Sequence, residues 1–106
     1  TKEMCKIDWR KTTREVHNFV RGLSPDPCAF ALHNGRMLNI YRTRKRDVAT
    51  AGAYPGEVLQ RSKTELAVAS VDGALTIEEV QLEGKKKLRI EEFLRGYRID
   101  TGDRLG

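Results

Sequence analysis

Apolar positions alternate most clearly between residues 66 and 87. Leu66 and Val68 are separated by a small residue, and the pair Asp72-Gly73 supplies a turn. Apolar residues then recur at positions 75 and 77, and beyond the glutamates at 78 and 79 they resume at 80 and 82. Side chains of a strand alternate with a period of two, so this change of phase requires an extra residue. The pattern predicts two strands joined by a turn, with a β-bulge at residues 78–79.

A helix is predicted over residues 12–23. Its apolar residues occupy positions 16, 19, 20 and 23, which is the i, i+3, i+4, i+7 spacing of one helix face. Thr12 and Glu15 form a T-x-x-E capping box, in which each side chain accepts a hydrogen bond from the other residue's backbone N–H. Arg14 and Arg21 fit a solvated helix face, and they also fit contact with phosphate.

Short strands and a second helix complete the pattern. Asn34-Gly35 predicts a hairpin of strands 28–32 and 36–43, because a type I′ turn needs positive φ at two successive residues. We expect a loop at 47–54, a strand at 57–61 and a short helix at 90–97, with Arg89 where a Ser, Thr or Asp cap is usual. The chain is therefore predicted to be mainly β with flanking helices. Its fold class is a small open β-barrel with one N-terminal helix and one short C-terminal helix.

The length of 106 residues fits a single domain. We expect residues 1–6 to be the end of an interdomain linker and residues 7–106 to form the barrel. A start without Met indicates a fragment. Trp9 is expected to be a packed lid rather than a platform for stacking a base, because it is the one tryptophan and stands apart from other aromatic residues.

Basic residues outnumber acidic ones by 20 to 15, which favours an acidic partner such as nucleic acid. They are concentrated at residues 42–46, RTRKR, and at the lysines of positions 85–87. In a strand, Arg42, Arg44 and Arg46 share one face. Such a run fits a charged edge that prevents aggregation, and it fits equally a track for phosphates.

Catalytic and metal-binding patterns are missing from the sequence. Cys5, His17, Cys28 and His33 lack CxxC or HxxxH spacing, so we expect no metal site and two free thiols in a reducing cytoplasm. The glycines form neither a GxGxxG nor a GxxxxGK loop, and no GxSxG elbow occurs. No apolar run approaches the roughly 18 residues of a membrane-spanning helix. The residues thus predict a binding or accessory domain.

Seven short motifs occur in a fixed order along the chain. They are Ile7-Asp8-Trp9, Arg21-Gly22-Leu23-Ser24-Pro25-Asp26-Pro27, Pro55-Gly56-Glu57-Val58, Asp72-Gly73-Ala74-Leu75, Gly84-Lys85-Lys86, Phe93-Leu94 and Gly102-Asp103-Arg104-Leu105. In order and spacing they resemble the C-terminal domain of methionyl-tRNA formyltransferases. The opening Thr1-Lys2-Glu3 is similar to the end of that family's interdomain linker.

This resemblance implies an open barrel similar to an OB-fold and a role in translation initiation. Enzymes of the family transfer a formyl group from 10-formyltetrahydrofolate to the methionine of initiator methionyl-tRNA. Their catalytic residues and folate site belong to an N-terminal domain, so the resemblance implies no catalytic residue and no cofactor in this chain. The C-terminal domain helps to hold tRNA through a basic surface, and the cations that match the family are Lys85, Lys86 and Arg42.

The candidate nucleic-acid-binding residues are accordingly Arg42, Arg44, Lys45, Lys85, Lys86 and Lys87. The expected partners are initiator methionyl-tRNA and an N-terminal catalytic domain in cis, and the protein is expected to be a cytoplasmic monomer. Two alternatives stay open: the C-terminal domain of a formyltransferase that acts on a nucleotide sugar, and a non-catalytic protein-interaction barrel.

Four residues, at three places in the chain, depart from the family pattern. Asp26 stands between two prolines where the family usually has an aromatic residue, which bears on local packing. Lys45 and Arg46 replace apolar residues, so they either add phosphate contacts or shift the end of the strand. Arg89 replaces a capping Ser or Thr, so the last helix is expected to start without a side-chain cap.

Overall fold

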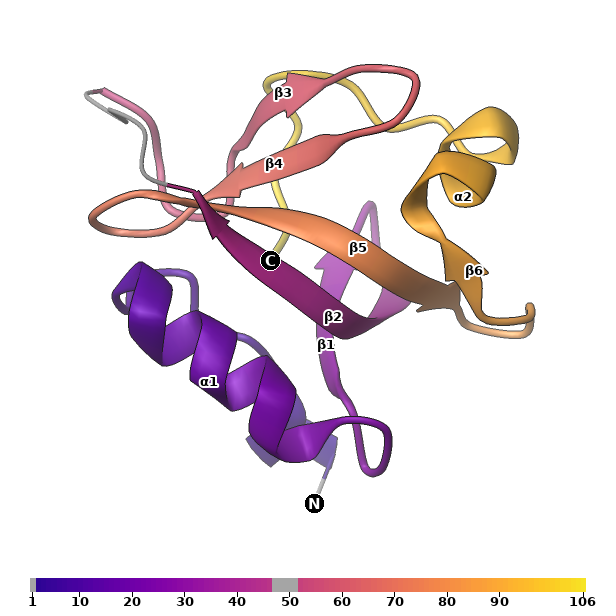
Figure 1. Ribbon diagram of the computed structural model, residues 1–106, viewed down its shortest axis with the longest axis horizontal. Coiled ribbons are helices and arrows are strands. Elements are labelled where there is room, and N and C mark those ends of the chain that lie inside the picture. Colours follow the sequence, from indigo (N-terminus) through magenta and orange to yellow (C-terminus); the bar gives the residue numbers. More distant parts are fainter. Residues whose placement is uncertain (1, 47–51) are drawn as a thin grey trace.

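The computed structural model describes residues 2–46 and 52–106 (Figure 1). A short 3-10 helix η1 and the helix α1 come first, six strands follow, and the helix α2 comes last. The elements are η1 (Lys2–Cys5), α1 (Thr13–Leu23), β1 (Ala29–His33), β2 (Arg36–Arg46), β3 (Val58–Arg61), β4 (Leu66–Ala69), β5 (Ala74–Leu82), β6 (Leu88–Arg89) and α2 (Ile90–Gly96). Residues 47–51 of the expected loop lie outside the described residues.

One antiparallel sheet contains all six strands in the order β1-β2-β5-β4-β3, and β6 pairs with β5. The long strands β2 and β5 form its centre (Figure 1). The predicted mainly β fold with an N-terminal and a short C-terminal helix is confirmed. β2 extends three residues beyond the predicted end, because Arg44, Lys45 and Arg46 pair with Thr76, Leu75 and Ala74.

The C-terminal residues connect the two outer edges of this sheet. At the β3 edge, Val58 N–H donates to the Asp103 carbonyl at 2.7 Å and Leu105 N–H donates to the Gly56 carbonyl at 2.8 Å. At the β1 edge, Leu32 and Gly106 exchange two backbone hydrogen bonds of 3.0 and 2.8 Å. The tail therefore satisfies backbone groups of both edge strands, which would otherwise be open to pairing with another chain.

The predicted bulge is confirmed. Ile40 pairs with Val80, Arg42 with Glu79, and the register then resumes with Thr43 opposite Ile77. Each strand contributes one extra residue, Tyr41 on β2 and Glu78 on β5. The bulge lets β5 bury Ile77 before it and Val80 after it. A bend of this kind curves the two central strands, as closure of a small barrel requires.

Both helices pack on the sheet with the faces that the sequence indicates. Thr12 caps α1 through the expected capping box, and Val16 and Val20 are buried. Arg89 precedes α2 and forms no capping side-chain hydrogen bond, as expected. The turn residues Asn34 and Gly35 have φ of 52° and 79°, which confirms the type I′ prediction.

The core lies inside the curved sheet and beneath the helices. Its fully buried side chains include Leu38, Ile40, Val58, Leu66, Val68, Leu75, Ile77 and Val80. Trp9 is 4% exposed and packs over Gly56, as the packed-lid interpretation predicts. Neither α1 nor α2 has the length and apolarity needed to cross a membrane, and this holds for the described residues as a whole.

Candidate nucleic-acid interface

Arg42 lies at the bulge and contacts carboxylates. Its guanidinium nitrogens are 3.6 Å from a Glu78 oxygen and 3.9 Å from a Glu79 oxygen. Arg89 of β6 pairs with Glu79 in the sheet register and lines the same hollow. Both glutamates line this hollow together with Arg42. A phosphate that binds Arg42 therefore competes with two carboxylates.

Arg44 and Arg46 share a single acidic partner. Glu65 precedes β4, and its two oxygens lie 3.5 Å from Arg44 and 3.6 Å from Arg46. The run at residues 42–46 therefore forms a ladder in which every arginine faces a carboxylate. A phosphate that binds here must compete with these ion pairs, although exposed pairs of this kind are individually weak.

Lys45 belongs to the opposite face of β2, the face covered by α1. The neighbouring Thr43 is buried, and its Oγ1 lies 2.9 Å from Nδ1 of His17 on α1. Burial, together with the positive charge of Lys45 and Arg21, lowers the pKa of His17. His17 is thus a half-buried group of the contact between α1 and the sheet.

The turn after β5 is tied to β2 by side chains. Nζ of Lys87 lies 4.4 Å from the ring centre of Tyr41, a cation–π distance. The Tyr41 hydroxyl donates to Gln81 Oε1 at 2.6 Å, and Gln81 Nε2 donates to the Lys85 carbonyl at 2.8 Å. These contacts hold the backbone of the turn against the sheet and leave the ammonium groups of Lys85 and Lys86 at the surface.

Lys85 and Lys86 border a groove beside α2. Its volume is about 270 Å³, and its apolar lining comes from Leu82, Leu88, Phe93, Gly96 and Tyr97, with Glu92 at the edge. Phe93 and Tyr97 stack with their ring centres 4.7 Å apart. Across the described ranges, neither lysine has a carboxylate within 4.0 Å. Lys85 and Lys86 therefore present positive charge that forms no ion pair with the described residues.

The six candidate cations thus form two groups with different chemistry. Arg42 and Arg44 are engaged by Glu78, Glu79 and Glu65, whereas Lys45, Lys85, Lys86 and Lys87 form no ion pair within the part of the chain that the structure describes. Uncompensated cations attract polyanions more strongly than paired ones, since no internal contact has to break. The Lys85–Lys87 turn, which gathers three of these four cations without an ion pair, is consequently the stronger candidate for phosphate contact.

His33 forms a buried polar cluster that the sequence patterns did not reveal. It flanks the turn as expected, but its side chain is only 1% exposed. Its Nδ1 lies 2.6 Å from the Tyr97 hydroxyl and its Nε2 lies 2.9 Å from Oδ2 of Asp103. Asp103 Oδ2 also accepts from the Asp100 backbone N–H, and these two bonds lower the pKa of Asp103. The cluster joins β1, α2 and the C-terminal tail, so it stabilises the barrel closure.

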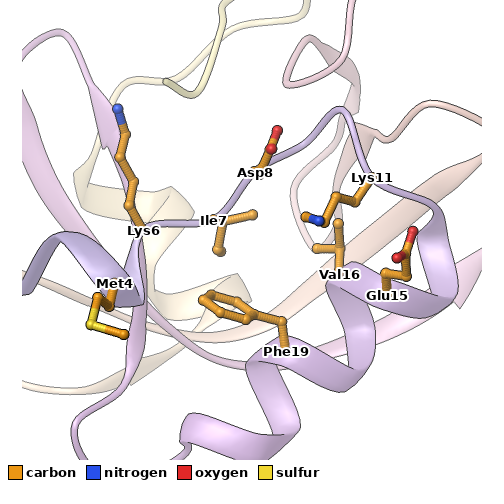
Figure 2. A pocket seen from close by; sticks show the side chains of 8 residues that line it. All are labelled: Met4, Lys6, Ile7, Asp8, Lys11, Glu15, Val16 and Phe19. Carbon is orange, nitrogen blue, oxygen red and sulfur yellow. The ribbon is translucent and has the colours of Figure 1, made fainter.

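A smaller hollow separates the N-terminal segment from α1 (Figure 2). Ile7, Val16 and the Phe19 ring form its apolar wall, while Asp8 and Lys11 lie at its rim (Figure 2). Its volume is about 100 Å³. Pockets for small-molecule ligands usually measure about 300–1,000 Å³, so this hollow is too small for a cofactor. Nor do three His, Cys, Asp or Glu side chains gather as metal ligands anywhere in residues 2–46 and 52–106.

Comparison with known sequences gives one family over nearly the whole chain. Residues 1–98 match the family described as "Formyl transferase, C-terminal domain". The chain is 44% identical over 105 residues to a protein of Geotalea daltonii named methionyl-tRNA formyltransferase, and 47% identical over 105 residues to one of the same name from Pelobacter propionicus. Each match covers 99% of this chain and 33% or 32% of the relative. The chain thus spans about a third of the length of these curated relatives.

Solved structures share the same fold. HypX from Aquifex aeolicus, crystallised in complex with tetrahydrofolic acid, superposes with a TM-score of 0.70 over 96% of this chain and 21% of its own. The identity is 21%, so the likeness concerns the fold. A variant of the same protein gives a TM-score of 0.71.

Proposed function

This chain belongs to the formyl transferase C-terminal domain family, and on that premise we propose that it is the tRNA-binding accessory domain of a methionyl-tRNA formyltransferase. In this role it holds initiator methionyl-tRNA while an N-terminal domain in cis formylates the methionine amino group. The observation that carries the proposal is the Lys85–Lys87 turn, whose ammonium groups have no carboxylate partner within the described residues.

The physical basis is contact with phosphate. Lysines that neutralise backbone phosphates release condensed counterions, and this release supplies affinity without reading the base sequence. A domain of this kind positions the nucleic acid, and recognition of the reacting end falls to the catalytic domain. We assign 10-formyltetrahydrofolate and all catalytic residues to that N-terminal domain. The proposal takes the protein to be a cytoplasmic monomer.

Binding of tRNA by two charge variants tests the proposal. Affinity of the chain for initiator methionyl-tRNA is measured by fluorescence anisotropy at several salt concentrations. For each phosphate contact with a duplex, the slope of log K against log salt has a magnitude of about 0.9. The variant Lys85→Ala/Lys86→Ala should bind more weakly, and the magnitude of its slope should be smaller by about 0.9 for each of the one or two phosphate contacts that are lost. Lys6→Ala/Lys11→Ala in the N-terminal segment removes the same charge and serves as control, because both side chains are exposed and form no ion pair within the described residues.

One result would contradict this function, and another would contradict only the residues assigned to it. If the unmodified chain fails to bind tRNA even at low salt, the domain has no independent tRNA-binding role. That result would favour the C-terminal domain of a nucleotide-sugar formyltransferase or a protein-interaction barrel. If it binds tRNA but the lysine variant behaves like the control, the assignment of Lys85 and Lys86 fails while the role of the domain stands.

A further inference from the structure

A second basic groove lies on the other side of α2. Arg61, Lys63 and Thr64 border it from the loop between β3 and β4, while Glu91, Leu94 and Arg95 line it from the helix. Its volume is about 440 Å³. Figure 1 shows α2 beside that loop and well away from α1. None of the sequence motifs considered above includes this loop or Arg95.

The two grooves use opposite sides of one helix. A helix turns about 100° per residue, so positions 91, 94 and 95 form one side. Positions 92, 93 and 96, which line the groove of Lys85 and Lys86, form the other, and Tyr97 follows the end of the helix. A nucleic-acid strand that crosses the exposed side of α2 therefore meets cations in the groove on each side of the helix.

Among the described residues, the cations of this second groove have no ion-pair partner. Neither Arg61, Lys63 nor Arg95 lies within 4.0 Å of a carboxylate in residues 2–46 and 52–106. Glu91, the acidic residue of the lining, is instead 3.1 Å from Arg89. This contrasts with the arginine ladder of β2, where each guanidinium faces a glutamate. Net positive charge in a concave surface concentrates anions.

The groove is also held in shape. The guanidinium of Arg61 donates to the Leu94 carbonyl at 2.7 Å and to the Ser62 carbonyl at 3.1 Å, so two of its five N–H groups fix its position. The other three have no partner among the described residues. Ser62 Oγ accepts from the backbone N–H groups of Thr64 and Glu65, which orders the loop that carries Lys63. An arginine fixed in this way is suited to bidentate contact with phosphate.

We propose that the groove of Arg61, Lys63 and Arg95 binds the phosphodiester backbone of RNA, as a second contact across α2 from Lys85 and Lys86. This inference rests on the proposed function, and it adds a second site that the RNA contacts beyond Lys85 and Lys86. It implies that α2 and its two flanking grooves, rather than the arginine ladder of β2, form the main contact surface.

Lys63→Ala/Arg95→Ala tests the inference in the whole chain. Both side chains are exposed, so the variant should keep the melting temperature of the unmodified protein. We expect tRNA affinity to fall on the order of tenfold near 0.1 M salt and the salt slope to drop by up to about two, one per phosphate contact. The charge-preserving Lys63→Arg/Arg95→Lys should retain most of the affinity, and Lys6→Ala/Lys11→Ala again controls for net charge.

The outcomes separate this inference from the broader function. If the unmodified chain binds tRNA and Lys63→Ala/Arg95→Ala matches the Lys6→Ala/Lys11→Ala control in affinity and slope, the second groove is not a contact, and this inference alone is overturned. If the unmodified chain does not bind tRNA, the proposed function and this inference fail together. A selective loss in Lys63→Ala/Arg95→Ala, restored by the charge-preserving variant, supports it.

Discussion

Asp72 accepts a hydrogen bond of 2.8 Å from the backbone N–H of Thr13, a residue 59 positions earlier in the chain. The Thr13 hydroxyl completes the contact, lying 3.1 Å from the same carboxylate oxygen and 2.6 Å from Ser70 Oγ. The β4–β5 loop thus supplies the first turn of α1 with a second acceptor, in addition to its own capping box. A carboxylate at a helix N-terminus also interacts favourably with the helix dipole.

This contact predicts a pH-dependent stability. The Thr13 backbone N–H, followed by the Thr13 hydroxyl, lowers the pKa of Asp72, although partial desolvation opposes them. A carboxyl group whose pKa is lowered on folding stabilises the protein above its unfolded pKa of about 3.9, and this stabilisation is lost as pH falls through the folded value. Asp72→Asn should therefore reduce the melting temperature at pH 7, and the difference from the unmodified chain should shrink below about pH 4.

Asp26→Asn is the control for this titration, because Asp26 forms no hydrogen bond among the described residues. Thermal melts from pH 7 to pH 2 give the comparison. A melting-temperature difference for Asp72→Asn that stays constant across that range would show that the carboxylate charge is not what stabilises α1.

Gly56 is predicted to be intolerant of alanine. Its φ is 92°, and an added Cβ would lie 2.5 Å from the Leu105 carbonyl oxygen and 3.3 Å from Cδ1 of Trp9. Gly56→Ala must therefore displace the tail that joins the sheet edges, and we expect a loss of about 1–3 kcal/mol in the free energy of unfolding.

Gly22 of α1 provides the matched control, since a Cβ there meets no atom within 4 Å. Gly22→Ala should stabilise the helix by up to about 1 kcal/mol. Urea unfolding of both variants measures the two changes. Equal stability of Gly56→Ala and the unmodified chain would mean that the tail is not held in this position.

The buried hydrogen bond between Tyr97 and His33 predicts a third effect. Tyr97→Phe keeps the ring that stacks on Phe93 but leaves Nδ1 of a 1% exposed histidine without its partner. An unsatisfied buried polar atom costs about 1–3 kcal/mol, which is the expected destabilisation. Tyr54→Phe removes a hydroxyl from a side chain that is 59% exposed and should change stability little. If both variants unfold at the same urea concentration, the cluster does not stabilise the closure.

Local patterns were sufficient to predict the elements that depend on neighbours in sequence. The Thr12–Glu15 capping box, the Asn34-Gly35 turn and the bulge at Glu78-Glu79 all follow from spacings of a few residues, and all are present. How the tail docks could not be predicted, because its partners near β1 and β3 are tens of residues away in the sequence.

Charge runs were less informative than helix and strand patterns. Four of the five residues at positions 42–46 are basic, and the sequence makes that plain. It does not reveal that Glu65, Glu78 and Glu79 lie beside the arginines of this run. Conversely, Arg61, Lys63 and Arg95 are scattered in sequence and form no run, yet they line one groove. Burial of His33 likewise depends on Tyr97 and Asp103, which no local spacing relates to it.

The pairing of Arg44 and Arg46 with Glu65 gives a last prediction, in which removing a negative charge increases RNA binding. Glu65→Gln leaves both guanidinium groups without their shared carboxylate and therefore free for phosphate. Under the proposed function, tRNA affinity should rise a few-fold at low salt and the salt slope should steepen by up to about one, because a new phosphate contact forms. Glu3→Gln in η1 makes the same change in net charge far from the ladder and is the control. Anisotropy titrations of both variants decide the matter: an equal gain for Glu65→Gln and Glu3→Gln would reflect net charge alone, and it would place the ladder outside the contact surface.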